Sequence, residues 1–572
     1  MIKSTVLSKT LFTVSGTAMT VLFTTKVSFP LFALGTVCSF AIFYWLAFKL
    51  NFLEKTLADT SKVQIVFALV LAVLANYQFT VRFASFTNSA LNKLSPHVGL
   101  SQFQWLLNLS LPIALGIASL FASFVFYLLI LKMICIPVKE SFNVSRKQLL
   151  FIILWGVVAS ICIAVLFNYT SAFSFPTMAD GTRNNNALFG SDGYAYSGYR
   201  HFFNGDSFRH PLFSVIFMPV LSFLVFLSWI FSMVISANEQ VIFSLLYSEF
   251  QIFVVIVTML ILYNLMKTFA KRDICFMSIV VLMCTFPVLL FSVLIERFAF
   301  ENFLLITFIY YIVKTEDEFN TRLAFALSTF SVISAAIAFP IIILKNKSLR
   351  KSFNYLLKTI VFVLYAMMAL GGTKLISTGL SDAQNNLRSY AKNNPERGFD
   401  SNFKQFLSFE SGMFVAPNWQ VINRTDDYPP HAILKYDTTE FPQGGIAQVY
   451  KQSQHYYILG MLVVALCALG FILNAKSLFM QSCFYWCVVC FCFLALLGVG
   501  SSLNEMYLYA YHFSWAQVLL VVMFVDKILP KKPLKIAILS GVAALIFSAN
   551  VYTLINMATQ LSIGFPKISC VN

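Results

Sequence analysis

Residues 190–236 read GSDGYAYSGYRHFFNGDSFRHPLFSVIFMPVLSFLVFLSWIFSMVIS. The segment up to residue 210 is polar and holds aspartate, tyrosine, histidine and arginine, whereas the run 211–236 is almost entirely hydrocarbon. Roughly 20 apolar residues are enough for a helix to cross the 30 Å hydrocarbon core of a bilayer. The junction at residue 211 therefore puts a concentrated polar segment at the edge of a membrane.

The whole chain has the composition of a polytopic membrane protein. Of its 572 residues, 59% are hydrophobic and 11% are charged, and the mean hydropathy is +0.77. These values lie outside the range of soluble globular domains. Apolar runs recur from residue 10 to about residue 556, so we expect an all-α polytopic membrane protein without a soluble domain of normal size. The net charge of +16 is spread over short clusters and forms no continuous stripe, so we expect no nucleic-acid partner.

Short basic loops predict the orientation, because Lys and Arg concentrate on the cytoplasmic side of membrane proteins. Seven clusters mark that side: Lys3/Lys9, Lys49/Lys55/Lys62, Lys139/Arg146/Lys147, Lys267/Lys271/Arg272, Lys314/Arg322, Lys345/Lys347/Arg350/Lys351 and Lys527/Lys531/Lys532. Threading helices between them predicts about 15 spans, with a cytoplasmic N-terminus and an external C-terminus. The predicted spans are 10–27, 29–50, 63–78, 108–134, 148–168, 241–266, 273–294, 299–314, 321–334, 336–346, 354–373, 456–474, 478–500, 506–527 and 533–556.

Two segments do not fit a simple alternation of spans. If 211–236 crossed the membrane, the cluster at Lys267 would lie outside, so we expect an interfacial or re-entrant helix there. The segments 321–334 and 336–346 are each too short to cross, and we expect them to form one broken pair. The predicted organisation is a four-helix N-terminal transmembrane extension (1–147), a core (148–373) with the external loop 169–210, an extracytoplasmic loop or small lid (374–455), and C-terminal transmembrane helices (456–572).

The positions of histidine and cysteine indicate on which side of the membrane any reaction takes place and whether disulfides or metal sites are expected. All six histidines fall on the predicted outer side, so we expect extracytoplasmic chemistry. Ten of the eleven cysteines lie in apolar runs, and no CxxC pair stands in a polar loop with metal-site spacing. We therefore expect neither disulfides nor structural zinc, and we assign no metal ligands. Dependence on a divalent metal cofactor is left open.

The polar segment has an order of residues found in a known superfamily. Asp192 is followed by Tyr196, then by Gly205 and by the pair His210–Pro211, which opens the apolar run. This order resembles the first external loop of GT-C superfamily glycosyltransferases, which include protein O-mannosyltransferases, aminoarabinose transferases and many bacterial polyprenyl-phosphate-sugar enzymes. The resemblance implies a GT-C-like transmembrane helix bundle, with an acidic residue after the first core helix and an interfacial helix behind it.

The likeness continues downstream of this loop. NLMKTFAKRD (264–273) resembles the basic cytoplasmic turn after the second core helix, and IERFAFENFLLITFIYYIVK (295–314) resembles the segment in which an external turn with an arginine opens the next helix. The broken pair at 321–346 also has a counterpart there. The resemblance covers roughly residues 148–374, and the four preceding helices have no counterpart in it.

Transfer of a sugar from a lipid phosphate needs a carboxylate that takes the proton of the acceptor hydroxyl, and cations that meet the leaving phosphate. The resemblance implies that Asp192 is this base, and Asp180 in MADG is the alternative. The alternative is that Asp192 in GSDG is an ordinary turn residue without a catalytic role. The substrate-binding candidates of the same loop, each of which is otherwise a solvated loop residue or a helix entry, are Tyr196, Arg200, His201, Arg209 and His210.

Further candidates lie on later helices. Arg297 either forms a surface ion pair with Glu296 or, as the resemblance implies, faces the donor phosphate. Glu249 lies inside an apolar helix, where a carboxylate is either functional or a satisfied structural partner. Glu505 and His512 are seven residues apart on one face of a late helix. They are substrate-binding candidates together with Tyr509, although a helix histidine is more often a packing residue.

The resemblance implies an inverting, GT-C-like hexosyltransferase in the bacterial cytoplasmic (inner) membrane. It would move a sugar from a polyprenyl-phosphate donor lipid to an extracytoplasmic acceptor, a polysaccharide or lipid-linked glycan such as lipopolysaccharide O-antigen. Surrounding membrane lipid is the other expected partner. Two alternatives stay open: an O-antigen polymerase or ligase that uses a diphosphate-linked donor, and a transporter or flippase for lipid-linked sugars.

Overall fold

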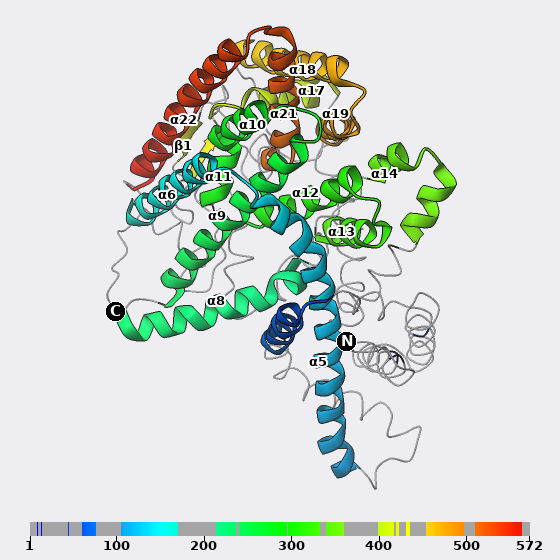
Figure 1. Cartoon of the computed structure of the whole chain (residues 1–572). Helices are drawn as coiled ribbons and strands as arrows, with labels where there is room; N and C mark the ends of the chain where they lie inside the picture. Colours follow the sequence, from blue (N-terminus) through cyan, green and yellow to red (C-terminus); the bar gives the residue numbers. More distant parts are fainter. Residues whose placement is uncertain are drawn as a thin grey trace.

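The structure is a computed structural model of the whole chain (Figure 1). It describes residues 9, 13, 44, 60–75, 104–169, 213–235, 239–294, 296–331, 339–357, 359, 399–416, 419–422, 431–434, 454–496 and 509–562. This part of the chain is helical except for two short strands, as an apolar chain in a bilayer must satisfy its backbone hydrogen bonds within each segment. The all-helical expectation is confirmed at this level.

The labelled elements follow the chain in order. The helices are α5 (Gln104–Ser141), α6 (Arg146–Tyr169), α8 (Phe213–Ile235), α9 (Glu239–Met266), α10 (Arg272–Cys284), α11 (Phe286–Val293), α12 (Phe298–Lys314), α13 (Glu318–Ser331), α14 (Phe339–Asn346), α17 (Phe399–Ser411), α18 (Gln454–Asn474), α19 (Leu478–Phe491), the π-helix η5 (Cys492–Leu496), α21 (Ala510–Ile528) and α22 (Lys532–Ser562). The strands β1 (Trp419–Ile422) and β2 (His431–Leu434) pair antiparallel.

Several helices are long and apolar enough to be membrane spans, which indicates an integral membrane protein. Within the described residues there are five, or six if the bent pair α10–α11 is one span: Arg146–Ala164, Ile242–Met266, Tyr457–Asn474, Leu478–Leu496 and Lys532–Met557. The further spans of the predicted total stay a prediction.

Helix α12 lies at the centre of the described bundle. Every residue from Phe298 to Ile312 is buried, and α12 contacts α9, α13 and α21. In lipid, a helix that is apolar all round gains nothing by hiding from the solvent, so packing between helices depends on close fit. Glycine provides that fit in α18. A Cβ at Gly460 would lie 2.0 Å from the carbonyl oxygen of Leu407 in α17, and a Cβ at Gly470 would lie 2.1 Å from that of Leu520 in α21.

Helix ends that carry predicted cytoplasmic clusters meet at one end of the bundle, which we call the basic end. Lys314, at the end of α12, forms an ion pair with Glu140 of α5, and Lys532, at the start of α22, forms one with Asp273 of α10. The pKa of Lys267, after α9, is lowered first by partial burial and then by the nearby Lys314 and Arg272 charges. The structure thus gathers positive charge at the basic end. The opposite end of the bundle, which we call the distal end, is formed by the α11–α12 turn and the start of α21.

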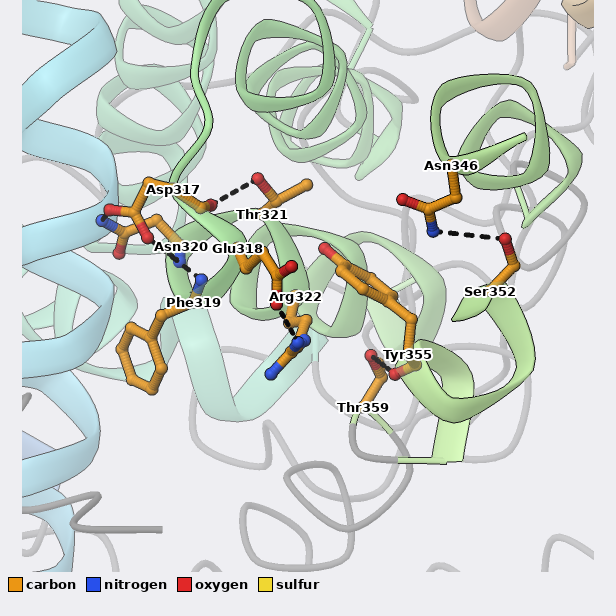
Figure 2. Close-up of polar contacts among 10 residues, drawn as sticks. All are labelled: Asp317, Glu318, Phe319, Asn320, Thr321, Arg322, Asn346, Ser352, Tyr355 and Thr359. Carbon is orange, nitrogen blue, oxygen red and sulfur yellow. Dashed lines mark hydrogen bonds and ion pairs between the residues drawn. The ribbon is translucent and has the colours of Figure 1, made fainter. Parts of the chain in front are cut away.

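Polar contacts at the basic end fix the turn that follows α12 (Figure 2). The Asp317 carboxylate accepts hydrogen bonds from the backbone N–H groups of Phe319 and Asn320, at 3.0 Å each, and caps the start of α13. Arg322 forms an ion pair with Glu318 one turn earlier, and its guanidinium lies 5.0 Å from the ring centroid of Tyr355. The pair is open to solvent, because the Glu318 side chain is 74% exposed.

The predicted span 273–294 is divided in two, which corrects the expectation of one helix. Helices α10 and α11 meet at Thr285 with a bend of 61°, and Pro287 stands in the first turn of α11, where its missing N–H costs nothing. Partners from elsewhere satisfy the interrupted backbone. Trp155 Nε1 donates to the Met283 carbonyl at 2.8 Å, and Asn550 Nδ2 of α22 donates to the Cys284 carbonyl at 2.9 Å.

Three further segments refine the expected organisation. The predicted helix 478–500 changes from α-helix to the π-helix η5 at Cys492. Helix α8 coincides with the predicted interfacial helix 211–236 and runs transverse to α5 (Figure 1); its depth in a membrane stays a prediction. The segment 374–455, expected as a loop or small lid, contains β1, β2 and α17. Helix α17 packs against α18 and η5, and its residues Gln405 to Ser411 are buried.

Candidate functional site

The turn between α11 and α12 is held in place by α9. Gln251 Nε2 donates to the backbone carbonyls of Phe291 and Leu294 at 2.6 and 2.7 Å, and its Oε1 accepts the Glu296 N–H at 3.4 Å. The hydroxyl of Tyr247 donates to the Glu296 carbonyl at 3.5 Å. One amide side chain therefore satisfies the carbonyls at the end of α11 and one N–H of the turn, so that the next residue, Arg297, has a defined position.

Arg297, Glu301 and His512 form a buried row of charged and titratable groups at the distal end, here called the distal cluster. Arg297 Nε lies 3.5 Å from Glu301 Oε1, and His512 Nε2 of α21 lies 3.2 Å from Glu301 Oε2. The three side chains are 5%, 0% and 7% exposed. Each oxygen of Glu301 faces a different nitrogen base, so this carboxylate joins α12 to α21 and balances the charge of the arginine.

Aromatic rings surround the distal cluster. Phe298 meets His512 edge to face, with ring centroids 5.1 Å apart, and lies 6.4 Å from the Tyr509 ring. Tyr509 in turn meets Phe493 of η5 at 5.6 Å. The indole N–H of Trp486 donates to the His512 carbonyl at 2.8 Å and ties the first turn of α21 to α19. These rings lower the local dielectric, which strengthens every charged contact of the cluster.

The structure brings three predicted site residues together, namely Arg297, Tyr509 and His512. The interpretation of Arg297 as half of a surface ion pair with Glu296 is wrong. Both residues are buried, at 4% and 2% exposure, and the ion pair given by the geometry joins Arg297 to Glu301. The Glu296 carboxylate instead accepts the backbone N–H of Arg297 at 3.1 Å.

The other predicted residues do not join this cluster within the described chain. Glu249 lies on α9 between Tyr247 and Gln251 but faces away from the turn, is exposed in the isolated chain, and accepts a hydrogen bond from Ser160 of α6 at 2.8 Å. This hydrogen bond agrees with the alternative of a structural partner. The remaining candidates lie outside the described residues: Asp180, Asp192, Tyr196, Arg200, His201, Arg209, His210 and Glu505.

Sequence reasoning missed the residues that hold the cluster. Glu301 was detectable as a carboxylate one turn after Arg297 in ERFAFENF, a spacing that allows an ion pair on one helix face. Gln251 and Tyr247 gave no comparable signal, because nothing in the sequence links α9 to a turn more than 40 residues later.

A second buried acid lies on α17, outside the spanning helices. Gln517 Nε2 of α21 donates to both oxygens of Glu410, at 2.6 and 2.7 Å. Burial raises the pKa of the Glu410 carboxyl to about 8, and the Gln517 hydrogen bond only partly opposes this increase. Gln517 Oε1 has no hydrogen-bond partner among the described residues, and a protonated Glu410 can donate to it. We did not predict this acid–amide pair.

The chemistry available at the distal cluster is anion binding and proton transfer. A buried guanidinium is the side chain best suited to a phosphate oxygen, and a histidine beside a carboxylate can hold or move a proton. No group of three or more His, Cys, Asp or Glu side chains is arranged to hold a metal ion in the part of the chain that the structure describes.

Comparisons with known proteins add no family. No family model, no curated protein and no solved structure matches this chain. The resemblance to GT-C enzymes therefore rests on the sequence motifs alone.

Proposed function

We propose that this protein is a membrane-embedded, GT-C-like glycosyltransferase that moves a sugar from a polyprenyl-phosphate donor to a cell-surface polysaccharide such as O-antigen. The observation that carries the proposal is the buried Arg297, which opens α12 at the distal end and lies beside Glu301 and His512. Removing a charge from water is costly, so an arginine held in an aromatic surrounding suits a function that needs a fixed cation.

The positions of the charges support an extracytoplasmic site. Under the positive-inside rule, the basic end defined by Lys314, Glu140, Lys532 and Asp273 faces the cytoplasm. The distal cluster then faces the outside of a bacterial inner membrane, close to the headgroups, where a polyprenyl phosphate keeps its charge. Arg297 would bind the donor phosphate and stabilise the charge that develops as the lipid leaves.

The acid–base chemistry is proposed for two parts of the chain. Asp192 would take the proton of the acceptor hydroxyl, with Asp180 as the alternative base. The Glu301–His512 pair would keep Arg297 in place and supply a proton to the departing phosphate. Contacts to the substrate are proposed for the loop residues Tyr196, Arg200, His201, Arg209 and His210, and for Tyr509 and Glu505.

The proposal is tested with purified protein in nanodiscs and a panel of radiolabelled polyprenyl-phosphate hexoses, by measuring the release of polyprenyl phosphate. We expect release by the native protein, none by Asp192→Asn, and at least a 100-fold lower rate for Arg297→Gln. Arg297→Lys keeps the positive charge but loses the planar guanidinium, so its rate is expected to lie between those of the native protein and Arg297→Gln.

Glu318→Gln, at the exposed pair of the basic end, is the matched control and should leave the rate unchanged. Thermal unfolding of each variant separates loss of chemistry from loss of fold. If the native protein releases polyprenyl phosphate from no donor of the panel, or if Asp192→Asn and Asp180→Asn both keep the native rate, the proposal is wrong. Release from polyprenyl-diphosphate donors alone would instead identify the polymerase or ligase alternative.

A transporter of lipid-linked sugars is the second candidate, and the break between α10 and α11 favours it. Discontinuous helices form binding sites in many transporters, because their ends leave backbone groups for a substrate. Here, however, Trp155 and Asn550 already satisfy the Met283 and Cys284 carbonyls at the break. Movement of a labelled lipid-linked sugar across liposomes without cleavage of the sugar–phosphate bond would identify this function.

A further inference from the structure

Helix α17 has two contrasting faces. On one face, Asp400 and Lys404 form an ion pair of 2.6 Å in which both side chains are largely exposed. On the other face, Phe406 and Phe409 are buried against neighbouring helices, and Leu407 lies in backbone contact with Gly460 of α18. Such a helix is expected to bury only apolar side chains, yet its buried part also contains polar ones.

Two buried amides, Asn402 and Gln405, lie one turn apart on α17. They are 7% and 3% exposed. Neither the nitrogen nor the oxygen of the Gln405 amide has a hydrogen-bond partner among the described residues, and Asn402 Oδ1 has none either. Native proteins pair the great majority of their buried polar groups, because an unpaired one keeps its full desolvation cost. Three unpaired atoms within one turn therefore point to a polar ligand.

Aromatic residues flank the two amides along α17. Phe403 and Phe406 of α17 both meet the ring of Phe491 edge to face, with centroids 6.2 and 5.4 Å apart. Phe491 directly precedes the π-helix η5, which packs against α17. Short π-helices that interrupt α-helices are frequently found at functional sites. Phe493 of η5 also meets Tyr509, whose ring lies 6.4 Å from that of Phe298 beside the distal cluster.

We propose that Asn402 and Gln405 form a binding subsite for a carbohydrate, which under the proposed function is the acceptor glycan. A sugar hydroxyl both donates and accepts a hydrogen bond, and an amide side chain offers one group of each kind. The C–H face of a pyranose fits an aromatic wall such as the Phe403, Phe406 and Phe491 rings. Through η5, the subsite adjoins the cluster proposed to bind the donor phosphate.

Binding is measured directly, without any donor lipid, by saturation-transfer NMR on protein in nanodiscs. The probes are methyl glucoside, galactoside, mannoside and rhamnoside, and the corresponding disaccharides. We expect at least one probe to bind the native protein, and Gln405→Met and Asn402→Leu to weaken that binding at least tenfold. Both substitutions replace a buried unpaired amide by an apolar side chain of similar size, so the thermal midpoint should not fall.

Lys404→Gln, on the exposed face of the same helix, is the matched control and should bind as the native protein does. If no probe binds, or if Gln405→Met and Asn402→Leu bind as tightly as the native protein, the subsite is refuted and the amides hold ordered water only. A rise in the KM for a glycan acceptor with unchanged kcat would support the subsite in the full reaction.

The subsite and the proposed function fail separately. If the native protein transfers sugar but both amide variants keep the native KM, the subsite is wrong and the glycosyltransferase stands. If the probes bind through Asn402 and Gln405 but no donor releases its lipid phosphate, the subsite stands as part of a carbohydrate-binding or carbohydrate-transporting protein.

Discussion

Two arginine–glutamate pairs of the same spacing lie at opposite ends of the bundle. Arg297 and Glu301 begin α12 at the distal end, and Glu318 and Arg322 begin α13 at the basic end (Figure 2). Both are pairs four residues apart on a helix, but Arg297 and Glu301 are 5% and 0% exposed, whereas Glu318 and Arg322 are 74% and 25% exposed. Water screens the exposed pair, whereas the buried pair keeps its full attraction and also its full desolvation cost.

This difference in burial gives the charged residues different roles at the two ends of the bundle. At the basic end, single contacts contribute little, and the sum of many Lys and Arg side chains sets the orientation. At the distal end, the buried charges of the distal cluster and of Glu296 each have a named partner: Glu301 for both Arg297 and His512, and the Arg297 backbone N–H for Glu296. A buried charge without such a partner would destabilise the bundle.

The largest expected effect comes from neutralising the carboxylate of the buried pair. Glu301→Gln leaves Arg297 buried beside a neutral amide, and breaking a buried ion pair in this way typically costs about 3–5 kcal/mol. Chemical denaturation in dodecyl maltoside should show this loss. Glu301→Asp is the control that keeps the charge. An equal stability of Glu301→Gln and the native protein would mean that burial does not distinguish the two ends.

The acid of α17 is expected to make stability depend on pH. Because the pKa of Glu410 rises from an ordinary 4.5 to about 8 on folding, the folded state holds its proton more tightly than the unfolded state. The contribution of Glu410 to stability should therefore be largest below pH 4.5, decrease by about 1.4 kcal/mol per pH unit up to pH 8, and change no further above it.

Glu410→Gln should abolish this decrease and stabilise the protein at pH 8, as seen in thermal unfolding between pH 5 and pH 9. The amide keeps the size of the side chain and a hydrogen bond with Gln517. Asp400→Asn, on the exposed face of α17, should retain the native slope. A native protein whose stability rises over this range would show that Glu410 is ionised in the folded state.

The smallest effect is expected at the basic end. Glu318→Gln removes one partner of the exposed pair, for which a change under about 0.5 kcal/mol is typical, and the change should shrink further in 1 M salt. Denaturation at low and high salt measures it. A loss as large as that of Glu301→Gln would contradict the view that exposure makes the second pair weak.

Much of the architecture follows from local sequence properties. Apolar length predicted the helices at 148–168, 241–266, 299–314, 456–474 and 533–556, and the structure has a helix over each of these ranges. Of the candidate site, Arg297 was found through the resemblance to GT-C enzymes, and Tyr509 and His512 were found because they lie near the outer end of a late apolar helix. Pro287 carried a signal for the break in 273–294, but a proline in the first turn of a new helix and one inside a longer helix look alike in sequence.

The sequence by itself determined that lipid surrounds most of this protein and at which end of the bundle positive charge gathers. Both properties are sums of hydrophobicity or charge over neighbouring residues. Only the tertiary structure decided that Glu301 meets His512, that Asn550 satisfies the break at Cys284, and that α17 buries Glu410 against Gln517. These helices are apolar on nearly every side, so no pattern along the chain reveals which face turns toward a neighbour. Close packing between whole helices sets that rotation, and with it the polar side chains that meet.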